Sequence, residues 1–176
     1  MTIPLIKVGI LTASDRCSRA EKKDESGLLL KSFIEERLGA EVIAYRVVPD
    51  DKEAIRKVIV HMADLFFCDL ILTTGGTGLG PRDVTPEATK ELIERETPGI
   101  SEAIRQQSMK KTKFAMLSRA VAGVRGKTLI INLPGSPSAV QEAFEVLEDV
   151  LAHAVALIHG EISDCQKALH SLYSHS

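Results

Sequence analysis

The sequence predicts an α/β domain in which a mostly parallel sheet is covered by helices on both faces. Short apolar runs typical of strands alternate along the 176-residue chain with apolar stripes at helical spacing. A hydrophobic content of 44% can fill one sizeable core, and no repeat, linker or low-complexity segment divides the chain. We therefore expect a single domain over residues 1–160, followed by a C-terminal tail over residues 161–176.

Five segments have the pattern of strands. The third is fully apolar at its start, as a strand buried in a parallel sheet would be. A turn around Gly126 is expected to join the last two. The expected strands are residues 7–12, 41–48, 70–74, 116–124 and 128–132.

The segments between the strands have the pattern of helices. Gly39 ends the first, since a residue without Cβ can adopt the left-handed conformation of a helix cap. Ser136 is the expected N-cap of the last and longest helix, with Pro137 at its first position. A break is expected at Pro98 and Gly99. The expected helices are residues 26–38, 55–66, 86–95, 100–110 and a final one that begins after Ser136.

Composition excludes several classes of protein. No apolar run approaches the ~20 residues needed to span a bilayer, and no signal-peptide pattern is present, so a cytoplasmic protein is expected. Three widely spaced cysteines, without a C-x-x-C pair, argue against a disulfide framework or a structural zinc site.

Charge is distributed unevenly. Residues 105–127 contain seven basic side chains and no acidic one, while the rest of the chain has 15 basic and 24 acidic residues, a balance of −9. This segment is either a solvated basic face or a local field for a small anionic ligand. Nucleic acid is an unfavourable partner, because aromatic residues make up only 4% of the chain.

Four polar segments directly follow expected strands. Because ligands of parallel α/β sheets bind outside the carboxyl ends of the strands, these segments should converge on one edge. They are Ser14–Arg16, Pro49–Asp51, Thr73–Gly78 and Leu133–Pro137.

The longest polar segment continues to Thr89 and reads TTGGTGLGPRDVTPEAT. Its glycines can bring backbone N–H groups close to an anion, and Thr74 and Thr77 can add hydroxyl donors. It is not a P-loop, because no Gly-Lys-Ser/Thr follows. A plain turn is the alternative for the glycines alone; with Arg82 and Asp83, the segment predicts a phosphate-sized cradle.

Asp50 and Asp83 are the candidate metal ligands. Mg²⁺ bound with a nucleotide typically takes one or two carboxylates, with waters and phosphate oxygens completing its shell. The alternative is that each aspartate only caps a helix, and Asp50 stands three residues before Glu53 in the spacing of a capping box. Arg82 could hold phosphate oxygens or pair with an aspartate.

No nucleophile motif is present, and the five histidines lie outside the strand-end segments. This pattern favours a transfer without a covalent enzyme intermediate, driven by positioning and charge neutralisation.

Six motifs follow one another along residues 5–158: GILTASDR, VVPDD, TTGGTGLGPRDVTPEAT, PGI at residues 98–100, LSRAVAG at 117–123 and INLPGSP at 131–137. With these motifs in this order, the chain resembles the MogA/MoaB family of molybdenum-cofactor proteins. The resemblance implies a three-layer α/β/α sandwich, a homotrimer, and transfer of AMP from Mg·ATP to the terminal phosphate of molybdopterin with release of pyrophosphate. A molybdenum-insertion enzyme is the implied partner.

The resemblance also implies roles for residues. Asp50 and Asp83 match the family's two important aspartates, and Gly75, Gly76, Thr77 and Gly78 match its nucleotide loop, beside Thr74 and Arg82. The residues matching the pterin side are Ser118, Arg119, Pro134, Gly135 and Ser136. A non-catalytic pterin carrier of the same fold remains the alternative to an adenylyltransferase, and another ATP-dependent enzyme, such as a nucleotide hydrolase, is a second rival.

Overall fold

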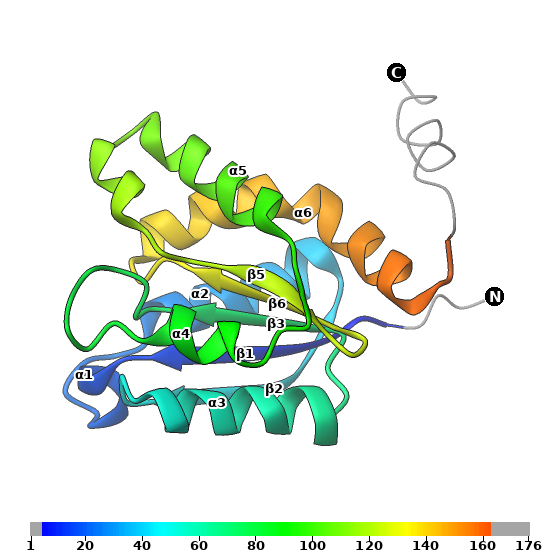
Figure 1. The fold of residues 1–176 in the computed structure, drawn as a ribbon, viewed down its shortest axis with the longest axis horizontal. Helices are drawn as coiled ribbons and strands as arrows, with labels where there is room; N and C mark the ends of the chain where they lie inside the picture. The colour runs from blue at the N-terminus through cyan, green and yellow to red at the C-terminus, as the bar shows by residue number, and fades with distance from the viewer. Residues whose placement is uncertain (1–4, 163–176) are drawn as a thin grey trace.

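A six-stranded sheet forms the centre of the computed structural model, which describes residues 5–162 (Figure 1). The strands are β1 (Lys7–Ala13), β2 (Glu41–Val48), β3 (Leu70–Thr74), β4 (Arg95–Glu96), β5 (Ala122–Arg125) and β6 (Thr128–Leu133). They lie in the order β2-β1-β3-β6-β5-β4, of which the first four are parallel and β5 is antiparallel to both neighbours. The predicted mostly parallel α/β fold is confirmed.

Helices cover both faces of the sheet, as Figure 1 shows. They are α1 (Asp15–Ser18), α2 (Glu25–Phe33), α3 (Lys52–Val60), α4 (Thr85–Lys90), α5 (Pro98–Met109) and α6 (Pro137–His159). On one face α2, α5 and α6 bury side chains such as Leu30, Ile104 and Phe144. On the other face α3 and α4 bury Ile59 and Ala88. Because each face has its own apolar core, the three-layer prediction is confirmed.

Most helix ends follow their sequence signals. Ser136 caps α6, since its Oγ accepts a hydrogen bond from the backbone N–H of Ala139, and Pro137 is the first helical residue. Gly39 has φ 63°, the left-handed conformation expected of it. It follows a π-helical turn, η1 (Ile34–Leu38), with which the α2 segment ends. A second such turn, η2 (His61–Leu65), ends the α3 segment.

The expected capping box at the start of α3 is wrong. Asp51, and not Asp50, caps this helix, because its Oδ1 accepts a hydrogen bond from the N–H of Ala54 at 2.8 Å. Glu53 pairs instead with Arg56 at 2.8 Å. The carboxylate of Asp50 is therefore left for other contacts.

The expected strand over residues 116–124 is wrong for most of its length. Its start lies in a 3-10 helix, η3 (Lys113–Leu117), and only its end belongs to β5. Between them, the carbonyl oxygens of Ser118 and Ala120 accept hydrogen bonds from the guanidinium of Arg105 on α5, at 3.4 and 3.0 Å. The Arg105 side chain thus binds carbonyl groups that a neighbouring strand would bind in a sheet. An apolar pattern in the sequence cannot reveal such a contact.

The segment before α5 also differs from the expectation. The helix expected over residues 86–95 ends at Lys90, and Arg95–Glu96 pair with β5. Pro98 and Gly99 lie in the first turn of α5 and do not interrupt it. Proline suits that position, because the first helical N–H has no intrahelical partner.

The parallel strands end level with one another. Thr12 pairs with Thr74, Thr74 with Leu133, and Ala13 with Val48. The four polar segments that follow these strands therefore emerge at the same edge, as expected of a parallel sheet. Residues 1–4 and most of the expected tail, residues 163–176, lie outside the described residues, and the predicted domain boundary at residue 160 stays a prediction.

Candidate functional site

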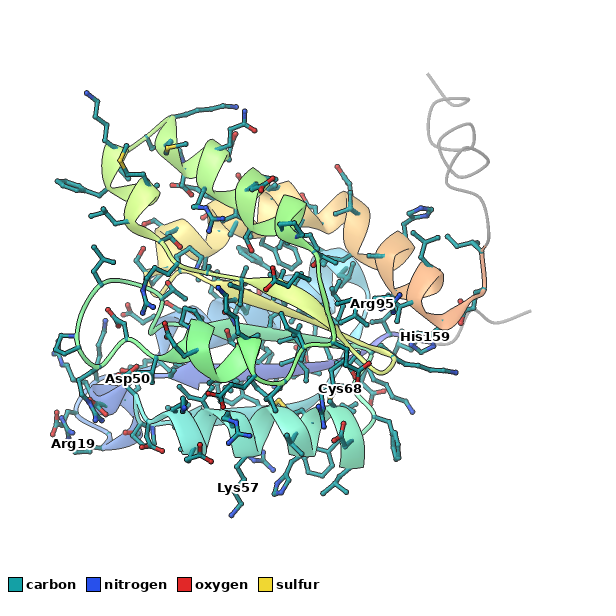
Figure 2. All side chains as sticks on the ribbon, in the orientation of Figure 1. Arg19, Asp50, Lys57, Cys68, Arg95 and His159 are labelled. Atoms are coloured by element: carbon teal, nitrogen blue, oxygen red, sulfur yellow. The ribbon has the colours of Figure 1, made fainter. Side chains whose placement is uncertain are left out.

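A cavity of about 200 Å³ lies at the carboxyl edge of the parallel strands. We call it the first cavity. Both candidate metal ligands, Asp50 and Asp83, line it together with Thr74, Gly75 and Gly76. Figure 2 shows Asp50 near α1, at the opposite end of the sheet from Cys68 and His159. The structure therefore brings the two aspartates and part of the glycine-rich loop to one place.

Asp50 is held in position by its neighbour across the strand ends. Its Oδ2 accepts a hydrogen bond from the N–H of Asp15 at 2.9 Å, and its own N–H donates to Asp15 Oδ1 at 3.0 Å. These reciprocal bonds join the loops after β1 and β2. Arg82 completes the group with two bonds to the Asp15 carboxylate, at 2.9 and 3.0 Å. Of the two roles considered for Arg82, the structure shows pairing with an aspartate.

The electrostatics of this group leave the Asp50 carboxylate short of positive partners. Burial raises the pKa of Asp50, the backbone N–H of Asp15 opposes this, and the charges of Asp15 and Asp83 raise it further. The pKa of Asp15 is lowered, chiefly by its hydrogen bonds with Arg82. A cation between Asp50 and Asp83 would relieve their repulsion.

The donor set fits a magnesium ion that is bound together with a nucleotide. Within residues 5–162, no group of three or more His, Cys, Asp or Glu side chains is arranged to hold a metal by itself. Two carboxylates in one cavity, Asp50 and Asp83, match the small protein share in sites where phosphate oxygens supply further ligands.

Asp83 does not cap the helix that follows it. Among the described residues, no side chain caps α4, whose N-cap is Val84. The Asp83 carboxylate instead turns back to its own loop, where Oδ2 accepts the N–H of Gly80 at 2.8 Å. A Cβ added at Gly78 or at Gly80 would lie 2.9 Å from that oxygen. The loop can wrap around the carboxylate because both positions lack a side chain.

The first two glycines of the loop adopt conformations that other residues rarely take. Gly75 has φ 92° and Gly76 has φ 66°. A Cβ on Gly75 would lie 2.3 Å from the carbonyl oxygen of Ala13, and one on Gly76 2.4 Å from Thr85 Oγ1. In the described part of the chain, no hydrogen bond uses the N–H groups of Gly76, Thr77 and Gly78. The loop thus has donors available for an anion.

Arg119 contacts the glycine-rich loop. Its guanidinium donates to the carbonyl oxygens of Gly78 and Asp83, at 2.7 and 2.6 Å, and forms an ion pair with Glu87. Its backbone N–H donates to the carbonyl of Thr77 at 2.9 Å. Arg119 therefore braces the glycine-rich loop, and its role on the pterin side stays a prediction.

A second cavity, of about 260 Å³, lies between α5 and the start of α6. Three of the predicted pterin residues line it, namely Ser118, Pro134 and Ser136. Sequence reasoning missed Ser108, which also lines this cavity. Ser108 is only 8% exposed, and its Oγ has no hydrogen-bond partner within the described part of the chain. A serine inside a helical pattern carries no sequence signal of such a role.

One loop forms a wall of both cavities. Gly135 and Pro137 line the first cavity, whereas Pro134 and Ser136 line the second. Two hydrogen bonds hold this loop in place: Thr74 Oγ1 donates to the carbonyl of Pro134 at 2.6 Å, and Ser26 Oγ donates to that of Gly135 at 2.8 Å. The two cavities are therefore adjacent across a fixed segment of backbone.

The basic segment over residues 105–127 is partly neutralised by the fold. Lys111 pairs with Glu142 at 2.9 Å, and Arg125 pairs with Asp64 at 2.6 Å. Together with the Arg119 pair, these contacts leave a weaker local field than the sequence alone indicated.

Comparisons with known proteins place this geometry in a family. Residues 9–153 match the family model described as "Probable molybdopterin binding domain". A molybdopterin adenylyltransferase of Helicobacter pylori strain J99 is 42% identical over 156 residues, which cover 88% of this chain and 89% of that protein. The molybdenum cofactor synthesis protein cinnamon of Drosophila melanogaster is 44% identical over 162 residues, or 92% of this chain, but this chain spans only 27% of its length.

A solved structure has the same fold. The molybdopterin biosynthesis enzyme MoaB from Thermus thermophilus superimposes with a TM-score of 0.83 at 50% sequence identity. The match covers 89% of this chain and 98% of that one.

Proposed function

The chain belongs to the family of molybdopterin-binding domains, and from this membership we propose that it is a molybdopterin adenylyltransferase. It transfers AMP from ATP to the terminal phosphate of molybdopterin, with release of pyrophosphate, in molybdenum cofactor biosynthesis. The family resemblance stated from the sequence is confirmed.

The two adjacent cavities are the observation that carries this proposal for the site. ATP would occupy the first cavity, beside Asp50, Asp83 and the glycine-rich loop, and the pterin the second. The wall formed by Pro134 and Gly135 is where the terminal phosphate of one ligand could meet the α-phosphate of the other. Transfer between two bound substrates requires such a meeting point.

The reaction needs little covalent chemistry from the protein. An ionised phosphate oxygen of the pterin forms a bond to the α-phosphorus, and the bond from that phosphorus to the bridging oxygen breaks. Pyrophosphate leaves with the electron pair, so no general base is required. The N–H groups of Gly76, Thr77 and Gly78 would stabilise the charge on the phosphate oxygens.

Asp50 and Asp83 would hold Mg²⁺. The ion would supply charge neutralisation at the triphosphate. The role of Asp15 is to fix Asp50 through the two backbone hydrogen bonds between them, at 2.9 and 3.0 Å. Arg82, bound to Asp15, would restrain the loop that carries Asp83.

The second cavity offers polar contacts for a phosphorylated pterin. The buried Oγ of Ser108 lacks a partner among the described residues and would gain one from the ligand. Ser118 and Ser136 add hydroxyl groups, and Arg105 brings positive charge to the same cavity, in which Lys111 is paired with Glu142. The predicted roles of Thr74 and Gly135 are to shape the wall between the cavities.

Mass spectrometry of molybdopterin after incubation with Mg·ATP tests the function directly. Adenylylated pterin and pyrophosphate are the expected products. The variant Asp83→Asn should remain folded, because Asn can still accept the Gly80 N–H, but should release pyrophosphate at least about 100-fold more slowly. Asp51→Asn, a change of the same kind in the α3 cap, is the matched control and should retain activity. Near-normal pyrophosphate release by Asp83→Asn would show that the reaction does not need the Asp83 carboxylate.

The same experiment decides the alternatives considered from the sequence. A non-catalytic carrier would bind molybdopterin and release no pyrophosphate. ATP loss in the absence of pterin would indicate a nucleotide hydrolase.

We further propose a homotrimer that acts in the cytoplasm, where ATP is available. The described helices include none with the length and apolar character to cross a membrane. An exposed apolar segment at the end of α5 and in η3, which includes Phe114 and Met116, supports self-association. A molybdenum-insertion enzyme would receive the adenylylated product.

A further inference from the structure

The first cavity is poor in positive charge for a site that takes a triphosphate. Four carboxylates line it, those of Asp24, Glu25, Asp50 and Asp83. Arg82, which was considered as a phosphate ligand, binds Asp15. Arg119 binds two carbonyl oxygens of the glycine-rich loop. A divalent cation between two of the carboxylates would offset only part of the negative charge of the site.

Lys22 and Lys23 supply the missing charge. Among the described residues that line the first cavity, they are the only lysines or arginines. Both lie in the connection between α1 and α2, and their side chains are exposed. Neither was singled out from the sequence, where they form part of an ordinary charged stretch.

A half-buried group of hydrogen bonds anchors this connection to the sheet. Asp24, the next residue, is the N-cap of α2 and accepts the N–H of Gly27 at 3.0 Å. Its Oδ2 also accepts the hydroxyl of Thr12 on β1, at 2.6 Å, and the hydroxyl of Tyr45 on β2. One carboxylate thus joins the lysine-bearing connection to two strands and a helix.

The anchor packs closely against Gly27. A Cβ added at Gly27 would lie 2.2 Å from Asp24 Oδ2 and 2.7 Å from the Tyr45 hydroxyl. Burial and the neighbouring Asp24 charge raise the pKa of Tyr45, so its hydroxyl keeps its proton as a hydrogen-bond donor at neutral pH. The connection is therefore tied to the sheet at Asp24, the residue directly after Lys22 and Lys23.

We propose that Lys22 and Lys23 bind the polyphosphate of the nucleotide, and that Asp24 and Tyr45 position them at the first cavity. This inference rests on the proposed function only in placing ATP in that cavity. The lysines are binding residues that would contact phosphate oxygens, while Tyr45 acts through Asp24 and touches no substrate.

The double variant Lys22→Gln/Lys23→Gln tests the binding role. Calorimetric titration with Mg·ATP should show an affinity about tenfold below that of the wild type, since hydrogen bonds to charged groups are lost. The affinity for AMP, which lacks the β- and γ-phosphates, should change less than about twofold. The control Lys31→Gln/Lys57→Gln removes two exposed lysines, on α2 and α3, and should bind ATP as the wild type does. Equal ATP affinity in both double variants would overturn the proposal.

Tyr45→Phe tests the positioning role, because it deletes the hydroxyl and keeps the ring. Trypsin should cleave after Lys22 and Lys23 several-fold faster than in the wild type, and Mg·ATP should protect these bonds in the wild type. The KM for ATP should rise several-fold with a smaller change in kcat. An unchanged cleavage rate together with an unchanged KM would overturn the positioning role.

Adenylylation and nucleotide binding by the two lysines can be tested independently. A wild-type protein that makes no adenylylated pterin, yet loses ATP affinity in the lysine variant, would disprove the proposed function and support this inference. A wild-type protein that adenylylates the pterin, with the same ATP affinity when Lys22 and Lys23 are replaced, would support the proposed function and disprove this inference.

Discussion

Single residues of the same type meet different demands in this protein, and glycine is the clearest case. Gly39 and Gly76 have almost the same φ, 63° and 66°. A side chain at Gly39 would meet nothing within 4 Å, whereas one at Gly76 would lie 2.4 Å from Thr85 Oγ1 and 3.2 Å from Asp50 Oδ1. The first glycine only ends a helix, while the second also makes room for the site.

Alanine substitutions should separate these two demands. Gly39→Ala is expected to lower the free energy of unfolding by about 1 kcal/mol, the cost of the left-handed conformation. Gly76→Ala carries the same cost and adds a steric clash, so a loss of roughly 2 to 4 kcal/mol is expected, with loss of pyrophosphate release. Urea unfolding and the adenylylation assay measure both effects. Equal stability losses in the two variants would show that the glycine-rich loop shifts to accommodate a side chain at position 76.

Two neighbouring aspartates at the start of α3 have different roles. Asp51 caps the helix, and Asp50 lines the first cavity. Asp51→Ala should lower the free energy of unfolding by about 1 kcal/mol, because the Ala54 N–H loses its cap. Asp50→Ala should instead abolish pyrophosphate release while α3 keeps its cap. Thermal unfolding and the adenylylation assay, run on both variants, check the assignment. A larger stability loss for Asp50→Ala than for Asp51→Ala, with activity retained, would show that Asp50 caps the helix.

The contact between α3 and α4 depends on pH. Glu91, at the end of α4, accepts a hydrogen bond from Lys52 at 2.8 Å, which lowers the pKa of the glutamate. A lowered folded-state pKa stabilises the protein above the unfolded-state value and loses this contribution as the pH falls through the folded-state value. Glu91→Gln should therefore be less stable than the wild type at about pH 7 and equally stable at about pH 2. Urea unfolding at the two pH values measures this; a difference that persists at the lower pH would contradict it.

At the scale of the whole molecule, two exposed apolar surfaces could mediate assembly. One is the segment with Phe114 and Met116, which are 79% and 60% exposed. The other, at the amino edge of the sheet, includes Phe67, which is 69% exposed. Only the first lies beside the second cavity, which Phe114 also lines. We therefore expect the first surface to form the contacts of the proposed trimer.

Polar substitutions should distinguish the two surfaces. Phe114→Glu/Met116→Glu should convert the proposed trimer to monomers, because burying the introduced carboxylates at the contact costs more free energy than burial of the remaining apolar area contributes. Phe67→Asn should leave the trimer intact; asparagine tolerates the φ of 53° found at that residue. Sedimentation velocity measures the mass of each variant. A trimer that survives the first change would exclude this surface.

Much of the architecture could be predicted because its signals are local. The strands over residues 41–48 and 70–74 and the caps at Gly39 and Ser136 follow from periodicity and from the chemistry of single residues. The strand expected over residues 116–124 failed because its carbonyl groups are bound by Arg105, a side chain on another element.

The alternation of strands and helices follows from the residue pattern, and so does the edge at which the polar segments and both aspartates emerge. The pairing of Arg82 with Asp15, the contacts of Arg119 with the loop, and the places of Lys22 and Lys23 at the first cavity appear only in the folded chain. Helix and strand patterns depend on residues a few positions apart. Arg82 and Asp15 are 67 positions apart and meet only because the parallel strands align in register.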